Sequence, residues 1–235
     1  TKGHCVISDM FHLEAIKLIS QSLRGAVQNT PEGREGMALG QYIAGMGFSN
    51  VGLGIVHSMA HGLSALYDTP HGVACAILLP VGLEYNKTVA GERYRAVGKA
   101  MGVQGIDEMN DVEAADATIA AVKQLSADVG IPANLHGILK EEDIQFLAES
   151  AFADACRPGN PRDTSVEEIV ELYKSQLSAE SERFTLIRNT GRCKITSQSR
   201  IRSTAPLPRG ASGEEIKLYE MPRPLLDRRG GIAKQ

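Results

Sequence analysis

The chain has 235 residues, a formal net charge of −3 and 43% hydrophobic residues, so it is long enough to bury one sizeable core. The charge gives no reason to expect nucleic acid or an anionic membrane as a partner, and the absence of an apolar run of about 18 residues predicts no membrane span. The four cysteines are scattered without a CxxC pair, which favours a reducing, cytoplasmic setting over a disulfide scaffold or a cysteine-type zinc site.

Residues 1–177 predict one helix after another. Ser8 or Asp9 can cap a first helix, whose apolar residues recur at helical spacing as far as Leu23. Pro31 fits the first turn of a second helix that runs towards residues 45–47. Residues 57–67 form a short third helix.

Further helices are predicted in the second half of this range. Residues 71–85 are apolar nearly all round, so this helix should be central and buried, and residues 91–101 form a short amphipathic helix. Asp111 can cap the next helix, residues 141–156 form another, and a capping box of Ser165 and Glu168 begins the last, which runs to about Leu177. Strand alternation, a Walker A motif and a GxGxxG between strand and helix are all missing. We therefore predict an all-α fold.

The charge balance changes near residue 178. Residues 178–235 hold 12 Lys+Arg against 6 Asp+Glu, a net of +6, whereas residues 1–177 carry −9. The segment has no sustained helical or strand period, so we expect a basic, poorly ordered tail. It is either a basic tail for an anionic partner or an extension foreign to the domain, and its dispersed arginines favour the second interpretation.

Three of the six histidines lie in one apolar stretch, GLGIVHSMAHGLSALYDTPHGVACAILLP (52–80). His57 and His61 are four residues apart and share a helix face. A tight turn at 68–70 would fold the next helix back, so that His71 and His57 converge on one cation, either Fe(II) or Zn(II). The alternative is that these are core histidines with satisfied hydrogen bonds.

Two histidines do not complete a metal site, because four-coordinate zinc or iron needs further ligands, usually including a carboxylate. Asp68 and Glu84 are the nearby candidates in the sequence. Asp68 is better explained as a turn residue, and Glu84 as a surface charge on its helix. The carboxylate ligand therefore stays unassigned from spacing alone.

The pattern GxxHSMAHxLxAxxxTPHGxAxAxLLPxxxxYN resembles the C-terminal helical domain of the iron-containing (group III) alcohol dehydrogenases. The similarity continues through GERYRAVGKAMGV and GNPRDTSVEEIVELY and covers residues 1–177. The resemblance implies a dehydroquinate synthase-like, all-helical domain, which in this family follows an N-terminal nucleotide-binding α/β domain. Since the sequence begins with Thr and not Met, we expect it to be a C-terminal fragment that starts partway through a longer chain.

The resemblance also implies the roles of individual residues. The family holds one divalent metal, iron in this branch, through an Asp, a His four residues later and two more histidines. His57 and His71 match the last two ligands. His61 matches a histidine beside the metal, which either relays the hydroxyl proton or orients water or ribose. Phe48 and Cys156 match positions that line the substrate pocket.

Other parts of the family pattern differ in this sequence. The first two ligands belong to a DAxxHxxE segment that would lie upstream of Thr1, as would the glycine-rich pyrophosphate loop. Cys75 stands where relatives often have Asn, and Gly62 where Pro is common. Neither difference removes a ligand that the sequence contains.

The function implied by the resemblance is a metal-dependent oxidoreductase that interconverts a small alcohol and an aldehyde with NAD and iron, with zinc as the alternative metal. The full-length enzyme would be a homodimer. One alternative is a non-catalytic helical remnant with weak or no metal binding, and another is a glycerol dehydrogenase-like or dehydroquinate synthase-like enzyme of the same fold. The stretches GMGFSN and TPHG favour the alcohol dehydrogenase branch. We expect the isolated chain to lack turnover.

Overall fold

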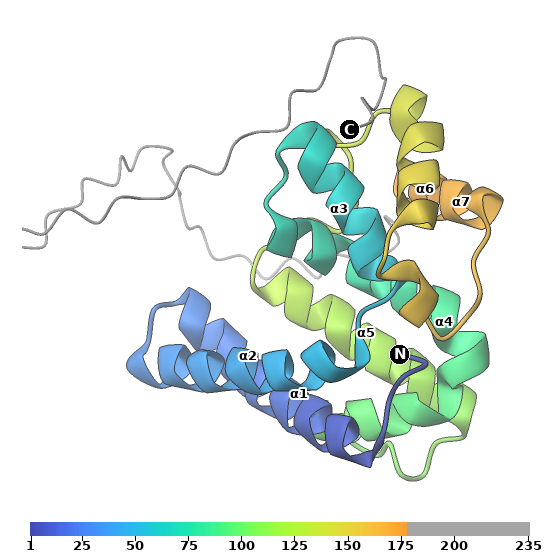
Figure 1. Ribbon diagram of the computed structural model, residues 1–235. Helices are drawn as coiled ribbons and strands as arrows, with labels where there is room; N and C mark the ends of the chain where they lie inside the picture. Colours follow the sequence, from blue (N-terminus) through green and yellow to red (C-terminus); the bar gives the residue numbers. More distant parts are fainter. Residues whose placement is uncertain (178–235) are drawn as a thin grey trace, which may run out of the picture. The chain divides into compact units, whose positions relative to one another are not determined.

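The computed structural model describes residues 1–177, and the predicted basic tail lies outside this range. The described residues form helices joined by loops, without a strand among them (Figure 1), which confirms the all-α prediction. Over the same residues, we find none of the helices both long enough and apolar enough to cross a bilayer. In chain order the helices are α1 (Val6–Val27), α2 (Pro31–Val51), α3 (Ile55–Tyr67), α4 (His71–Met101), α5 (Asp111–Asp128), η1 (Glu141–Asp143), α6 (Ile144–Ala153), η2 (Arg157–Gly159) and α7 (Val166–Ser175).

Two helix starts differ from the predictions. The cap of α1 is Cys5, because the hydroxyl of Ser8 accepts a hydrogen bond from the Cys5 amide at 2.9 Å and so belongs to the first turn. The cap of α5 is Asn110 instead of Asp111, since its Oδ1 accepts from the amides of Val112 and Glu113. By contrast, the predicted box of Ser165 and Glu168 does begin α7.

Helix α4 joins the two helices that we predicted over 71–85 and 91–101. The chain continues through them with a kink at Ala90, whose φ of −132° and ψ of 15° are not helical. Gly91 follows directly, and glycine has the greatest backbone freedom of all residues. Helical hydrogen bonding continues on both sides of Ala90, so the two predicted helices are one kinked helix in the structure.

A single apolar core holds α3 in place. Helix α3 packs against the first half of α4 and against α6, which in turn contacts α7 (Figure 1). The Tyr173 hydroxyl of α7 donates a hydrogen bond to the Met59 carbonyl of α3 at 2.8 Å, and both residues are buried. Such a buried, satisfied hydrogen bond fixes the middle turn of α3 against the core. The largest fully buried apolar side chains of this core are Ile55, Met59, Leu63, Ile77, Leu78, Leu135, Leu147, Ile169 and Tyr173.

Helices α1 and α2 pack through a row of glycines. Gly33, Gly40 and Gly47 are the buried residues of α2, and they recur every seven residues on the face that meets α1. A Cβ atom on Gly33 would lie 2.3 Å from backbone atoms of Gly25 and Ala26. The two backbones therefore approach more closely than any side chain would allow.

The carboxylate of Glu168 links α7 to α4. It accepts hydrogen bonds from the Tyr85 hydroxyl at 2.9 Å, from Arg162 at 2.5 Å and from the Ser165 amide at 3.0 Å. The Tyr85 hydrogen bond is the largest cause that lowers the pKa of Glu168 below its ordinary 4.5, and partial burial opposes it. Because the pKa of Glu168 is lower in the folded state, its ionised carboxylate stabilises the folded state at pH values above the ordinary pKa. This contribution is lost as the pH falls through the lower pKa of the folded state.

We expect Glu168→Gln to lower the free energy of unfolding by about 1–2 kcal/mol near pH 7, because it weakens the capping box and the pairing with Arg162. The loss should shrink as the pH falls below the ordinary value of 4.5 and through the lowered pKa of Glu168, because wild-type Glu168 becomes protonated there. Urea denaturation across this pH range measures both effects. The control is Glu171→Gln, since Glu171 is exposed and pairs with Lys174 on its own helix. Equal losses for the two variants would contradict the assignment.

Candidate metal-binding site

A three-residue connection brings the histidines together. Helix α3 ends at Tyr67 and α4 begins at His71. Between them Asp68 adopts the left-handed conformation, with φ 52° and ψ 24°, which an Asp tolerates in turns. The chain reverses there, and the start of α4 packs against α3. Asp68 is therefore a turn residue, as the sequence indicated.

The three imidazole rings form one group, which we call the histidine cluster (His57, His61 and His71). The ring centroids of His57 and His71 are 5.4 Å apart, those of His61 and His71 are 5.2 Å apart and stacked, and those of His57 and His61 are 6.3 Å apart. The convergence predicted from spacing is thus present. The cluster is accessible, because His71 and His61 are exposed and His57 is half-buried.

Two donor atoms of the cluster, together with the thiol of Cys75, fit a divalent cation. One ligand atom each of His57, His71 and Cys75 lies within 4.8 Å of the others, so the three can face a single ion. Burial is the largest cause that lowers the pKa of His57, and the neighbouring His71 and His61 rings lower it further. A lowered pKa keeps the His57 imidazole neutral at neutral pH, and a neutral ring has the lone pair that coordination requires.

His61 has a different partner. Its Nδ1 lies 2.8 Å from Oδ2 of Asp154, and Oδ1 of Asp154 accepts a hydrogen bond from the Cys156 amide at 2.7 Å. Burial alone would raise the pKa of Asp154, but the hydrogen bonds from His61 and Cys156 outweigh it and lower that pKa below its ordinary value. Asp154 is therefore ionised at neutral pH and orients the His61 ring.

Asp154 is the residue that sequence reasoning missed. It directly follows α6 and is 93 residues from His61, so only tertiary packing brings the two side chains together. Glu84 has other partners, since it pairs with Lys87 and Lys123 on the surface. The carboxylate beside the histidine cluster is thus neither Asp68 nor Glu84.

The two predicted substrate-binding residues lie in different surroundings. Cys156 belongs to a group with His61 and Asp154 whose ligand atoms lie within 4.8 Å of one another. Phe48 is 42% exposed near the end of α2, and no contact described for residues 1–177 links it to the histidine cluster. Its role in substrate binding stays a prediction.

Both cysteines near the cluster are thiols at neutral pH. Burial, and then the nearby Cys156, raise the pKa of Cys75 to about 11. Burial, and then the charge of Asp154, raise the pKa of Cys156 as well. Neither group is an activated thiolate, so nucleophilic cysteine chemistry is not indicated here.

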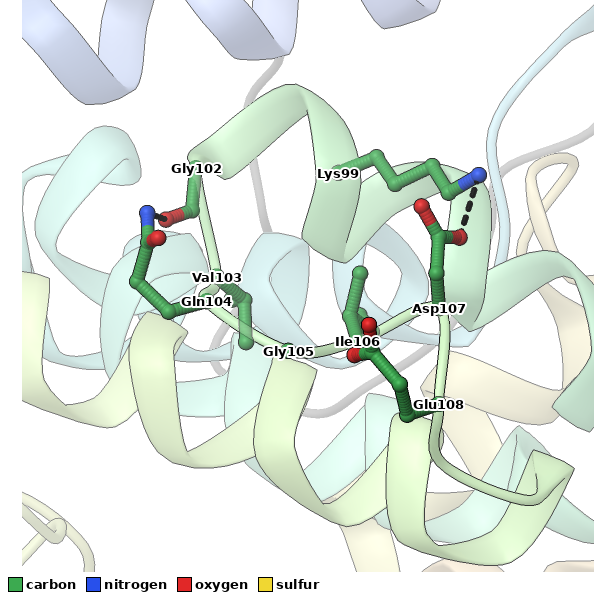
Figure 2. A pocket seen from close by; sticks show the side chains of 8 residues that line it. All are labelled: Lys99, Gly102, Val103, Gln104, Gly105, Ile106, Asp107 and Glu108. Atoms are coloured by element: carbon green, nitrogen blue, oxygen red, sulfur yellow. Dashed lines mark hydrogen bonds and ion pairs between the residues drawn. The ribbon is translucent and has the colours of Figure 1, made fainter.

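A separate cavity of about 300 Å³ opens at the opposite end of α4 (Figure 2). Its walls are formed by Lys99 and the loop that follows α4, residues 102–108. The charges of Lys99 and Asp107 already pair with each other across it. Among residues 1–177, the groups of side chains that could hold a metal ion lie at the histidines and not at this cavity, so we assign it no ligand, and the histidine cluster is the candidate site.

Comparison with known proteins gives the family of the chain. Residues 4–177 match the model of the "Fe-containing alcohol dehydrogenase family, C-terminal". The chain therefore belongs to the Fe-containing alcohol dehydrogenase family, and the matched region is the helical C-terminal domain of its members. The resemblance inferred from the sequence is confirmed.

Particular relatives carry more specific names. Lactaldehyde reductase of Escherichia coli (strain K12) is 51% identical over 174 residues, which are 74% of this chain and 45% of that protein. The 1,3-propanediol dehydrogenase of Citrobacter freundii is 40% identical over 171 residues, or 72% of this chain and 44% of that protein. The chain thus spans about half the length of the curated relatives that it matches.

Solved structures give the same result. The crystal structure of a 1,3-propanediol oxidoreductase superposes with a TM-score of 0.72 at 39% identity, covering 74% of this chain and 46% of that one. An alcohol dehydrogenase from Oenococcus oeni superposes with a TM-score of 0.71 at 42% identity, with the same coverage of both chains. The helical arrangement is therefore the one found in solved alcohol dehydrogenases.

Proposed function

We propose that the chain is the metal-binding helical part of an NAD-linked oxidoreductase that interconverts a small alcohol and its aldehyde, of the lactaldehyde reductase or 1,2-propanediol oxidoreductase type. The observation that carries the proposal is the convergence of His57 and His71, from two helices, with His61 beside them. The 51% identity to lactaldehyde reductase supports the choice of substrate class.

In this proposal His57 and His71 hold the divalent ion, which is Fe(II) by family and Zn(II) as the alternative. When bound, the ion supplies Lewis acidity that stabilises an alkoxide during hydride transfer to or from the nicotinamide. Phe48 and Cys156 border the substrate. Because His57 is half-buried and His71 is exposed, an ion held by them would be accessible from the solvent side.

His61 is proposed to relay the hydroxyl proton. Asp154 accepts a hydrogen bond from Nδ1 of His61, which fixes the tautomer that leaves the lone pair on Nε2. That nitrogen can take up the proton of an alcohol and return it to an aldehyde oxygen in the reverse direction.

The whole enzyme is proposed to be a cytoplasmic homodimer that binds a small alcohol or aldehyde and no nucleic acid. For this 235-residue chain alone we expect no turnover, because it spans 45% of the length of lactaldehyde reductase and the resemblance places two metal ligands and the nucleotide loop in the remainder. Detectable NAD-dependent oxidation of 1,2-propanediol by the purified chain would contradict this expectation.

A binding experiment tests the two ligands directly. We expect the His57→Ala, His71→Ala double variant to bind Fe(II) or Zn(II) at least about 100-fold more weakly than wild type, because even residues outside the coordination sphere cost about 10- to 100-fold. Anaerobic equilibrium dialysis followed by elemental analysis measures this. His136→Ala is the matched control, since His136 is exposed on a different loop. Equal metal content in the double variant would remove the assignment and favour the non-catalytic remnant.

A further inference from the structure

We propose that Cys75 is a third ligand beside His57 and His71, so that this chain has a nitrogen-and-sulfur site selective for a thiophilic divalent cation such as Zn(II) or Co(II) over Fe(II). The inference rests on the proposed function, whose two histidine ligands it shares. It adds a ligand that the spacing of the histidines did not indicate.

The separation of Cys75 and His71 matches a coordination edge. Cys75 lies four residues after His71 on α4, so the two side chains share one helix face. Sγ of Cys75 and Nε2 of His71 are 3.5 Å apart. Bond lengths of about 2.3 Å for Zn–S and about 2.1 Å for Zn–N at the tetrahedral angle give an edge of about 3.6 Å. The distance between the two donor atoms therefore already matches the edge of a tetrahedral coordination site.

His57 supplies the donor that distinguishes a metal site from a simple S–H···N hydrogen bond. That hydrogen bond also fits 3.5 Å, but it needs no third group. Here His57 approaches from α3, and no donor pair of the three is further apart than 4.8 Å. This exceeds a tetrahedral N···N edge of about 3.4 Å by about 1.4 Å at most. Rotation of the exposed His71 ring can close such a gap, and the fourth position stays available to a donor that these three residues do not supply.

The donor set decides which cation is preferred. Thiolate is a soft ligand that selects zinc-like cations, and the stability order of divalent ions places Fe(II) below Co(II) and Zn(II) at such sites. On binding, the Sγ–H bond breaks, the sulfur electron pair forms the bond to the cation, and the proton passes to the buffer. The resulting thiolate is half-buried but paired with a positive ion, so its burial is compensated.

The neighbouring group of His61, Asp154 and Cys156 is a weaker candidate for the same ion. Nδ1 of His61 is already paired with Asp154 at 2.8 Å, and the other oxygen of Asp154 accepts the Cys156 amide. Its carboxylate is thus already paired with one nitrogen of His61 and with the Cys156 amide. Within the described residues, the group of Cys75 is the one in which two histidines and a thiol lack a carboxylate partner.

Cobalt spectroscopy of the full chain tests the proposal. Under anaerobic, reducing conditions we expect Co(II) to give an intense near-ultraviolet sulfur-to-cobalt charge-transfer band, which histidine ligands alone do not produce. Cys75→Ser should abolish the band and weaken Zn(II) binding by more than roughly 100-fold in competition titrations. A triple variant, Cys5→Ser, Cys156→Ser, Cys193→Ser, should keep the band because Cys75 is its only thiol.

Each other outcome is decisive. If wild type binds Co(II) without the charge-transfer band, Cys75 is not a ligand, while the histidine pair of the proposed function survives. If no Co(II) binds at all, both proposals fail. If the band persists in Cys75→Ser or disappears in the triple variant, the sulfur ligand is another cysteine and the inference is wrong. The triple variant decides the matter even if Cys75→Ser does not fold.

Discussion

Leu147→Ala should lower the free energy of unfolding by about 3–4 kcal/mol, within the range of about 2–5 kcal/mol for buried leucines. Leu147 is fully buried on α6. A Cβ atom on Gly62 would lie 2.9 Å from Cδ2 of Leu147, so the leucine methyl group packs directly on the backbone of α3. Removing it leaves a cavity beneath the helix that carries His57 and His61.

Urea denaturation of the metal-free chain measures this loss, and Phe146→Ala is the control. Phe146 is the neighbouring residue on α6 but is 61% exposed, so its truncation should cost within about 0.5 kcal/mol. The comparison separates burial from side-chain size, because the larger residue is the one with the smaller expected effect. Similar losses for the two variants would mean that α6 does not pack on α3 as described.

Gly33→Ala should be at least as damaging, with an expected loss of about 3 kcal/mol or more. Overpacking costs typically about 1–3 kcal/mol when side chains can move aside. Here the atoms 2.3 Å from the new Cβ belong to the backbone of Gly25 and Ala26, so α1 and α2 have to separate. Relief by a rotamer change is not available at this contact.

Gly45→Ala on the same helix is the matched control for this effect. Nothing lies within 4 Å of a Cβ at Gly45, so the substitution should stabilise α2 by about 0.5–1 kcal/mol through the higher helix propensity of alanine. Thermal unfolding measures both variants, and hydrogen exchange should locate the Gly33→Ala loss in α1 and α2. Stabilisation by both alanines would show that the two backbones are not in close contact.

Most helices were predictable because their signals are local. The box of Ser165 and Glu168 marks the start of α7 within four residues, and apolar spacing marks the helix bodies. The start of α1 was predicted wrongly because Ser8 and Asp9 are both residue types that commonly cap helices. In the structure the Ser8 hydroxyl accepts a hydrogen bond from the Cys5 amide, so Cys5 is the cap and Ser8 lies inside the first turn. The continuity of α4 through Ala90 was missed because a kinked helix and two short helices have the same periodicity.

From the sequence, only the part of the site that lies in the hairpin of α3 and α4, around the turn at Asp68, could be predicted. His57, His61 and His71 lie within one helical hairpin, so helix geometry and a short connection sufficed to predict their convergence. Asp154 follows the C-terminal end of α6, 93 residues after His61, and no local pattern connects the two residues. Cys75 was visible one turn after His71, yet a lone cysteine among apolar residues has no ligand signature until His57 is seen to face it.

The three-residue connection between α3 and α4 also makes this segment intolerant of length changes. Each residue added to a helix turns everything after it by about 100° and advances it by about 1.5 Å. One insertion between His61 and Tyr67, or one deletion of Asp68, Thr69 or Pro70, would aim His71 and Cys75 away from His57. A substitution in this segment would change the metal affinity gradually, whereas a single insertion or deletion would separate His71 and Cys75 from His57 and so abolish the whole ligand set.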